Sequence, residues 1–291
     1  MPHGGPGHEA PPYQGQLPPQ NYAPPQNYPQ GMPPDAGGAP PKKGGSFVTR
    51  IFRDPLSIVL AVVVVVALVA AGVVGAELYA RHRADEVVAK ATECVVQDSA
   101  SVSFGASPFL LQHMTGHYGN ISISTGGNQI REAKGMKADI NIDDVRLAGN
   151  GNSKGTIGSL DATITWTADG IKQTIQNSIP LVGSFVTGVT TNPSNGTITL
   201  EAPLGSIVAK PTVVDNGISL QVQELTGLGF TLPREAVQPA LDAFTSQLTK
   251  NYPLGIHADS IQVTDSGVIS KFSTQNAAIP VGGSDPCFAG V

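Results

Sequence analysis

An uninterrupted apolar run near the N-terminus constrains this chain more than any other feature of its sequence. Residues 56–76 contain no charged side chain and consist mainly of Val, Ala and Leu. A helix needs about 20 such residues to cross a hydrocarbon core roughly 30 Å thick. The alternative is a buried core helix, but the run is apolar on every side, which favours lipid as its surroundings. We therefore expect a transmembrane helix at 56–76.

A cleaved signal peptide is a second alternative for the same run. Val74-Gly75-Ala76 resembles a small-residue cleavage site. However, the apolar part of a signal peptide usually has about 7–15 residues and follows a short charged segment, whereas here 55 residues precede the run. We therefore favour an uncleaved anchor.

The residues on the two sides of the run indicate its orientation. Positive residues are slightly more frequent before the run, at Lys42, Lys43, Arg50 and Arg53, than after it, at Arg81, Arg83 and Lys90. The positive-inside rule then places the N-terminus in the cytoplasm. Both cysteines, Cys94 and Cys287, follow the run. A possible disulfide between them would need an oxidising compartment, which agrees with an external C-terminal domain, although two unrelated buried thiols stay the alternative.

Composition divides the rest of the chain. Thirteen of the 24 prolines precede residue 46, so we expect residues 1–45 to be a disordered, Pro-rich cytoplasmic tail. A basic juxtamembrane segment, 46–55, follows the tail. We expect one extracytoplasmic domain at 84–280 and a C-terminal tail, 281–291, that contains Cys287. From residue 84 onward, 11 Lys and Arg stand against 18 Asp and Glu, a net charge of −7 that argues against nucleic acid as a partner.

The pattern of apolar residues changes from helical to alternating beyond the anchor. Val87, Val88 and Ala91 recur at helical spacing, which predicts a helix over 81–98 that continues from the span or hinges just after it and packs on a sheet. Further helices are predicted from Asp169 to Pro180 and from about Pro239, after a separate turn. Between the helices, apolar and polar residues alternate, and turns rich in Gly, Asn and Asp separate the runs. The fold class expected is α+β, with a long curved antiparallel sheet wrapped on helices.

The segments of the sequence that resemble catalytic or metal-binding motifs lack the residues or the context that these motifs need. Gly151-Asn152-Ser153-Lys154-Gly155 has the letters of a nucleophile elbow but lies in a turn without the strand and helix that this motif needs. His113 and His117 are four residues apart, yet no third metal ligand lies close in sequence. Strict alternation would place Asp143 and Asp144 on opposite faces of a strand, where they cannot form an acid/base pair. We therefore expect no enzyme activity, no cofactor and no metal.

Several short segments together resemble the LmeA family of mycobacterial-type envelope proteins. The segments are Val102-Ser103-Phe104, Pro108-Phe109-Leu110-Leu111, Gly116-His117-Tyr118, Gly158-Ser159-Leu160 before Trp166, Phe230-Thr231-Leu232-Pro233, Tyr252-Pro253-Leu254-Gly255-Ile256 and Val263-Thr264-Asp265-Ser266-Gly267. Their order and spacing over 84–280 carry the resemblance, since none is specific alone. Family members often have an aromatic residue before Pro-Phe-Leu, where this chain has Ser107.

The resemblance implies a tubular lipid-binding architecture, in which a curved sheet encloses an apolar cavity. It also implies phospholipid binding and a supporting role in cell-envelope lipid or lipoglycan (mannan-type) maturation or transport. Without the resemblance, the aliphatic interior is interpreted more simply as a solid core. A different function is also open, namely a non-catalytic interaction scaffold for envelope biosynthesis enzymes, with the Pro-rich tail as a ligand for partners.

The candidate lipid contacts are aliphatic or aromatic residues in three groups. The predicted lip near the membrane comprises Phe109, Leu110 and Leu111; the sheet side comprises Ile140, Ile142, Ile164, Trp166, Leu220 and Val222; and the helix side comprises Phe244 and Leu248. Each of these residues would also serve as ordinary core. The expected ligand is a membrane phospholipid, which long aliphatic walls bind without a charged anchor.

Overall fold

The computed structural model describes residues 55–149, 153–178, 183–249, 253–280 and Cys287. The chain divides into residues 1–58, of which only Pro55–Ile58 are described, and residues 59–291. The predicted tail 1–45, the juxtamembrane segment up to residue 54 and all of 281–291 except Cys287 lie outside the described residues. The domain boundaries at those places therefore stay predictions.

A single helix, α2 (Pro55–Val96), joins the apolar run to the folded part of residues 59–291. Its 42 residues correspond to a length of about 63 Å at 1.5 Å per residue. The helix is long and apolar enough to cross a bilayer, and the side chains of its apolar part are largely exposed. The helix predicted from Arg81 onward therefore continues from the apolar run without a hinge.

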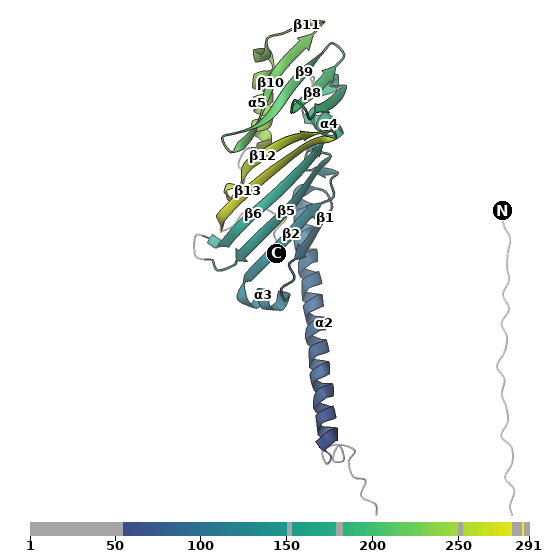
Figure 1. The fold of residues 1–291 in the computed structure, drawn as a ribbon, viewed down its shortest axis with the longest axis vertical. Helices are drawn as coiled ribbons and strands as arrows, with labels where there is room; N and C mark the ends of the chain where they lie inside the picture. Colours follow the sequence, from purple (N-terminus) through teal and green to yellow (C-terminus); the bar gives the residue numbers. More distant parts are fainter. Residues whose placement is uncertain (1–54, 150–152, 179–182, 250–252, 281–286, 288–291) are drawn as a thin grey trace, which may run out of the picture. The chain divides into compact units, whose positions relative to one another are not determined.

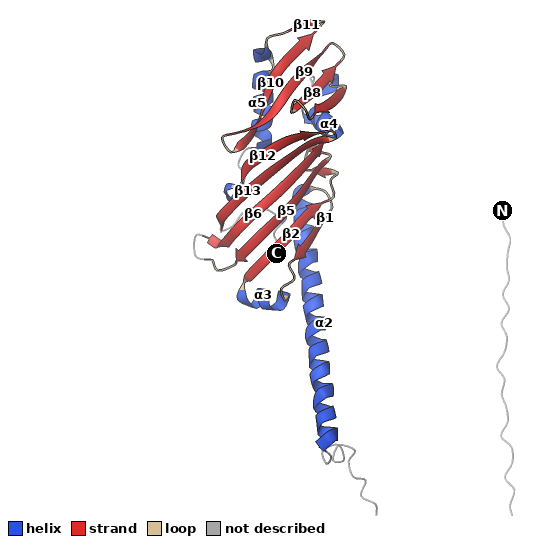
Figure 2. Ribbon diagram, viewed as in Figure 1, coloured by secondary structure: helices blue, strands red, loops and turns tan. Residues whose placement is uncertain are grey.

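The larger sheet has six antiparallel strands and contains most of the alternating segments (Figures 1 and 2). Its order is β1-β2-β5-β6-β13-β12. The strands are β1 (Ala100–Phe104), β2 (His117–Thr125), β5 (Met136–Arg146), β6 (Ser153–Thr167), β12 (His257–Thr264) and β13 (Gly267–Pro280). A short helix, α3 (Phe109–Thr115), connects β1 to β2, and the two-residue strands β3 (Gln129–Ile130) and β4 (Ala133–Lys134) form a small hairpin before β5.

A second antiparallel sheet of five strands lies in the order β11-β10-β9-β8-β7. The strands are β7 (Gly188–Asn192), β8 (Thr197–Ala202), β9 (Gly205–Val214), β10 (Gly217–Gly227) and β11 (Phe230–Thr231). Two helices, α4 (Ala168–Ser178) and α5 (Gln238–Thr249), and three short 3-10 turns, η1 (Gly183–Phe185), η2 (Arg234–Ala236) and η3 (Pro253–Gly255), complete the described elements. The expected α+β class with a long antiparallel sheet is confirmed.

Proline chemistry explains where α5 begins. Pro239 lacks a backbone N–H and is tolerated in the first turn of a helix, where that group has no partner within the helix. The structure accordingly has the turn η2 at Arg234–Ala236 and begins the regular helix at Gln238. The side-chain amide of Gln238 both donates and accepts a hydrogen bond with the backbone of β10. Its Nε2 donates to Leu220 O, and its Oε1 accepts from the Val222 N–H, each at 2.8 Å. This pair of hydrogen bonds attaches the start of α5 to β10.

Each of four neighbouring strands of the larger sheet has one residue that is left out of the ladder pairing, and these four residues form a row across the sheet. The row comprises Gly119 on β2, Asp144 on β5, Gly158 on β6 and Asn276 on β13, and the residues on both sides of each continue the ladder. Asp144 and Asn276 have positive φ, 54° and 51°. A positive φ interrupts the extended conformation of a strand, in which φ is about −120° to −140°. Because the four residues align across the sheet, we infer that the sheet bends along this row.

The row also shifts the alternation of side chains by one residue. On every strand, two inward-facing residues stand three positions apart across the row instead of two. These pairs are Tyr118 and Ile121, Ile142 and Val145, Ile157 and Leu160, and Thr274 and Ala277. The inner face therefore stays largely apolar on both sides of this row, with Thr274 as a buried polar exception.

The same irregularity corrects the expectation for the adjacent carboxylates. Asp143 Oδ1 accepts a hydrogen bond from Asn120, whereas Asp144 Oδ1 contacts His117 Nε2 at 2.6 Å and Arg146 Nε at 2.9 Å. All these partners alternate with inward-facing residues, so both carboxylates face outward. Placement on opposite faces was wrong because Asp144 adopts a positive φ and interrupts the alternation. The two carboxylates still have separate partners.

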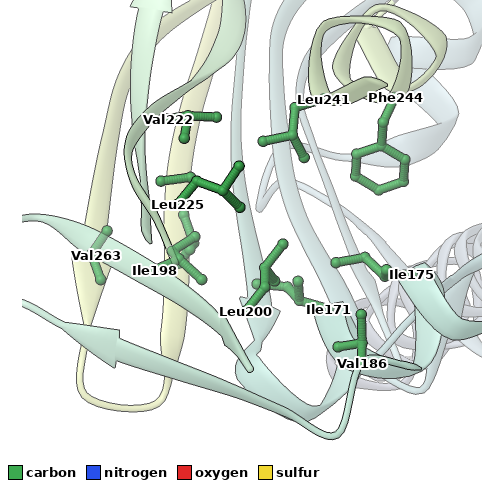
Figure 3. Close-up of a cluster of buried hydrophobic side chains, with 12 residues drawn as sticks. Ile171, Ile175, Val186, Ile198, Leu200, Val222, Leu225, Leu241, Phe244 and Val263 are labelled. Carbon is green, nitrogen blue, oxygen red and sulfur yellow. The ribbon is translucent and has the colours of Figure 1, made fainter. Parts of the chain in front are cut away.

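Two clusters of buried side chains form the interior. The first cluster lies between the smaller sheet and helices α4 and α5, where Leu241 and Phe244 point toward Leu225 and Ile175 (Figure 3). The second lies on the inner face of the larger sheet and includes Phe104, Leu160 and Phe272. The outer face of β1, β2 and β5 is polar, and Ser, Asp and Asn side chains bond one another along it.

We predict that Gly158→Ala destabilises the domain by about 1–3 kcal/mol, the usual cost of overpacking. A Cβ atom at Gly158 would lie 2.7 Å from Asp144 Cβ, which is a clash with atoms close to the backbone. The measurement is the thermal unfolding of the full chain in detergent micelles, followed by circular dichroism. Gly119→Ala, in the same row but with open space around its Cβ position, is the matched control and should change the midpoint little. Equal midpoints for both variants would contradict the packing described for this row.

Candidate functional site

Two residues of α2, just after the apolar run, form hydrogen bonds that attach the folded domain to this helix. Glu77, which directly follows the run, accepts the backbone N–H groups of Phe109 and Leu110, the latter at 2.9 Å. These are the first N–H groups of α3, which have no partner within their own helix. One turn further along α2, Arg81 donates to the backbone O atoms of Phe104, Gly105 and Ser107 at 2.7–2.8 Å. Glu77 and Arg81, called the junction residues below, therefore fix α3 and the end of β1 to α2.

The environment of Glu77 favours its charged form. The pKa of the Glu77 carboxyl is lowered from its ordinary value, first by the Leu110 N–H and then by the Phe109 N–H, with a smaller contribution from Arg81. A carboxyl whose pKa is depressed on folding stabilises the fold above its unfolded pKa, and this stabilisation is lost as the pH falls through the folded pKa. The junction should therefore be intact at neutral pH and weaken in acid below about pH 4.3, the ordinary Glu pKa.

The inner face of the larger sheet presents an aliphatic surface to α2. Ala80, Ala84 and Val88 stand four residues apart on one side of α2 and pack against the inner cluster. Their small side chains fill little space, and several large side chains of the inner face are only half-buried. These half-buried residues are Ile121, Ile140, Ile142, Ile164, Ile256 and Ile279. Such a surface suits an acyl chain, because burial of its methylenes is favourable without directional contacts.

The predicted contact residues fall into both interior clusters. Ile140, Ile142 and Ile164 face α2 in the cluster of the larger sheet, together with buried Phe109. Trp166, Leu220, Val222 and Phe244 belong to the cluster beneath α4 and α5. The Trp166 indole N–H donates to Lys134 O at 2.8 Å, so this ring has a structural partner. For Leu248 only the backbone is described, so its contacts lie outside the described residues.

The three residues of the predicted apolar lip differ in their exposure. Phe109 is 6% exposed and packs edge to face on Phe104, with ring centroids 5.1 Å apart. Leu110 is half-buried, whereas Leu111 is 59% exposed. Two further exposed residues, Met114 on α3 and Leu147 just after β5, were not singled out from the sequence. Their spacing shows nothing unusual by itself, because only the tertiary position of α3 decides which of its sides faces outward.

One carboxylate oxygen near the inner face has no hydrogen-bond partner. Asp85 Oδ1 is buried, and no donor reaches it from the described residues. Asp85 lies one helical turn beyond Arg81 and two turns beyond Glu77 on the same side of α2. A buried carboxylate oxygen without a donor is costly, so a water molecule or a ligand hydroxyl or ammonium group would be favoured there.

A hollow of about 330 Å³ lies on the outer face of β1, β2 and β5. The residues around it are mostly polar and do not include any residue of α2: Ser101, Val102, Ser103, Ser122, Ile123, Ser124, Asp139, Ile140 and Asn141. Ser124 donates to Asp139, and this bond together with Lys137 lowers the pKa of the Asp139 carboxyl. An acyl chain in this hollow would desolvate the Asp139 carboxylate and its hydrogen-bonding partners, which costs free energy.

The residues considered for catalysis have structural partners. His113 Nδ1 lies 3.2 Å from the Tyr118 hydroxyl, while His117 contacts Asp144, so the two imidazoles serve different contacts. The Ser153 hydroxyl donates to Gly155 O and Ile279 O at the strand pair β6–β13. Among the described residues, no group of three or more His, Cys, Asp and Glu side chains could hold a metal ion.

The two cysteines are joined in the structure. Cys94, near the end of α2, forms a disulfide with Cys287, and their Cα atoms are 5.5 Å apart. The bond connects segments 193 residues apart in the chain and attaches the C-terminal region to α2. A bond across so long a loop restricts the unfolded chain strongly.

Fold and site together define an α+β domain whose apolar inner face lies against a helix that is apolar enough to span a bilayer. The chain belongs to the LmeA-like phospholipid-binding family, whose model matches residues 71–272. This membership confirms the resemblance and supports phospholipid binding. Uncharacterized proteins of Mycobacterium tuberculosis and Mycobacterium bovis are each 55% identical to this chain over 242 residues, which cover 82% of this chain and 70% of the relative. No solved structure matches the chain.

We predict that Glu77→Gln weakens the junction, because the neutral amide has one acceptor oxygen for two N–H donors and no charge to attract Arg81. The expected result is faster hydrogen–deuterium exchange at the amides of Phe109 and Leu110, measured on the full chain by mass spectrometry at neutral pH. Glu86→Gln is the matched control, because Glu86 also lies on α2 and pairs with Arg83 and Lys90 on an exposed side. Unchanged exchange in Glu77→Gln would show that Glu77 does not hold α3.

Proposed function

We propose that this chain is a membrane-anchored, extracytoplasmic phospholipid-binding protein whose ligand occupies the space between α2 and the inner face of the larger sheet. The observation that carries the proposal is the continuity of α2. Its first half has the length and composition of a membrane span, and its second half packs on an aliphatic surface. A lipid that leaves the bilayer along this helix would therefore exchange one apolar environment for another.

The energetics of such a transfer rest on acyl-chain burial. Each buried methylene contributes about 0.8 kcal/mol relative to water, so the free energy lost on leaving the bilayer is regained for every methylene that the inner face covers. A charged anchor is not required for this part of the ligand. The buried oxygen of Asp85 would accept a hydrogen bond from a hydroxyl or ammonium group of a lipid headgroup.

The proposed topology places the N-terminus in the cytoplasm and the domain in the periplasm or cell envelope. Two observations support it: the excess of positive residues before the apolar run, and the disulfide, which needs an oxidising compartment to persist. The unbroken passage of α2 into the domain supports an anchor over a cleaved signal, because cleavage after Ala76 would leave Glu77 at a new N-terminus.

The proposed role is non-catalytic support of envelope lipid or lipoglycan maturation or transport, in keeping with the family's phospholipid binding. The alternative, an interaction scaffold for envelope biosynthesis enzymes, needs no lipid. The purified full chain distinguishes the two, because a scaffold should carry no stoichiometric phospholipid after exchange into lipid-free detergent.

We predict that a phospholipid with a photoreactive diazirine in its acyl chain labels the inner face of the larger sheet. The expected sites are Ile140 and Ile164 on the sheet and Val88 on α2, found by peptide mass spectrometry of the full chain after irradiation. The internal control is Thr163, which lies beside Ile164 on β6 and faces the opposite side of the sheet. Labelling of the apolar run alone, with none in the domain, would refute the proposed site.

A matched variant supports the labelling experiment. Ala84→Trp places a large ring in the space between α2 and the sheet and should reduce labelling of the inner face, whereas Arg83→Trp, on the exposed side of α2, should not. Circular dichroism establishes that both variants are folded. Equal labelling in the two variants would place the lipid elsewhere.

We predict that cysteine alkylation of the denatured, unreduced full chain labels neither Cys94 nor Cys287, and that reduction makes both reactive. The reason is the disulfide, which persists in an oxidising compartment. The measurement is the mass shift after alkylation of protein isolated from its native membrane. Two reactive thiols before reduction would argue against both the disulfide and an external domain.

A further inference from the structure

Three large apolar side chains are exposed together at the α3 end of the larger sheet. Leu111 and Met114 stand three residues apart on one side of α3 and are 59% and 84% exposed. Leu147 is 52% exposed and lies at the end of the same helix, where its backbone N–H donates to Gly116 O at 2.8 Å. We call Leu111, Met114 and Leu147 the α3 patch. Within the described structure, this patch has no covering element.

The position of the α3 patch relative to the apolar run follows from the junction residues. Glu77 is the first residue after the run, and it bonds the first two N–H groups of α3 directly. α3 therefore lies at the level of α2 where the predicted span ends, at the end of the sheet nearest the apolar part of α2 (Figure 1). Arg81 fixes the connection between β1 and α3 at the same level.

The neighbouring residues have the chemistry of a membrane interface. Leu78 and Tyr79 follow Glu77 on α2 and are exposed, and Tyr is enriched where hydrocarbon meets headgroups. The next exposed charged residue on α2 is Arg83, which suits anionic headgroups. α3 has no acidic residue in its first turn, and its one titratable side chain is His113. No carboxylate of α3 therefore opposes contact with lipid.

We propose that α3 is seated in the interface of the bilayer that α2 spans, with the α3 patch in contact with the acyl-chain boundary. The occupant of the patch is thus the lipid surface, because α2 brings the patch to that surface through the Glu77 hydrogen bonds. Contact of α3 with the bilayer adds a second attachment to the one that α2 provides, and it restricts the tilt and rotation of the domain relative to the membrane. The inference rests on the proposed membrane anchoring but not on the proposed lipid site.

The seating would also place the lower end of the inner face at the bilayer surface. Phe109, whose backbone bonds Glu77, packs with Phe104 and Tyr118 in the cluster of that face. The α3 patch and the inner cluster thus lie on two sides of one short helix. Contact of the patch with lipid therefore brings the acyl-chain boundary to the end of the aliphatic surface.

The test uses nitroxide labels in the full chain, reconstituted in vesicles of phosphatidylcholine and phosphatidylglycerol. Because the native cysteines form a disulfide, single labels attach at Met114→Cys, Leu147→Cys, Leu228→Cys and Val65→Cys. Leu228 is the matched control: it is 73% exposed and lies in the turn between β10 and β11, at the other end of the described domain from α3. Val65, in the apolar run, is the reference for lipid. Electron paramagnetic resonance then compares collisions with oxygen, which enters lipid, and with an aqueous nickel chelate.

We expect the ratio of oxygen to nickel collisions at Met114 and Leu147 to shift toward the value at Val65, and the ratio at Leu228 to match water. The same low ratio at Met114, Leu147 and Leu228, with a high ratio at Val65, would overturn the seating of α3 while leaving the anchor in place. A low ratio at Val65 would overturn the anchoring and this inference together. Because all labelled positions are exposed, none of these variants removes a core contact.

Discussion

The structure depends on one helix that changes its surroundings at a single residue. Up to Ala76, α2 is apolar on every side and suits hydrocarbon; from Glu77 onward it packs against protein. A carboxylate and a guanidinium at such a boundary are costly unless they are hydrogen-bonded. The junction residues meet this requirement with the N–H groups of α3 and the carbonyl groups after β1. The polar groups that directly follow the apolar run are therefore the groups that attach the domain to it.

Small side chains on α2 and the bend of the larger sheet act together. Ala80 and Ala84 pack against the inner cluster and fill little space, while the inferred bend at the unpaired row from Gly119 to Asn276 leaves the inner residues largely apolar on both sides. A flat sheet would contact a straight helix along a narrow strip only. Gly158 is needed in this row, because a Cβ atom there would meet Asp144.

The sequence predicted those features that depend on local pattern. The apolar run, the alternating strands and the start of α5 near Pro239 all follow from periodicity or from the chemistry of one residue. The unpaired row was not predicted from the sequence. It is defined by the alignment of residues on neighbouring strands, whereas the sequence of one strand shows only a shifted alternation, as at Asp144. The partners of Glu77 and Arg81 were missed for the same reason: 32 residues separate Glu77 from Phe109. The outward side of α3 follows from those contacts, and so Met114 could not be recognised in advance.

The proposed lipid site is confined to one of the two halves of the domain. Beneath α4 and α5, two helices cover the smaller sheet, and the side chains of Leu241, Phe244 and Ile175 occupy the space between them. Along α2, a single helix with small side chains covers the larger sheet and leaves several Ile residues half-buried. Beneath α4 and α5 the side chains are closely packed, so a ligand would bury little further apolar surface there. An acyl chain beside α2 would bury apolar surface that the protein alone leaves exposed to water. The proposed lipid site therefore lies in the half that α2 covers, where the path from the proposed membrane span would be shortest.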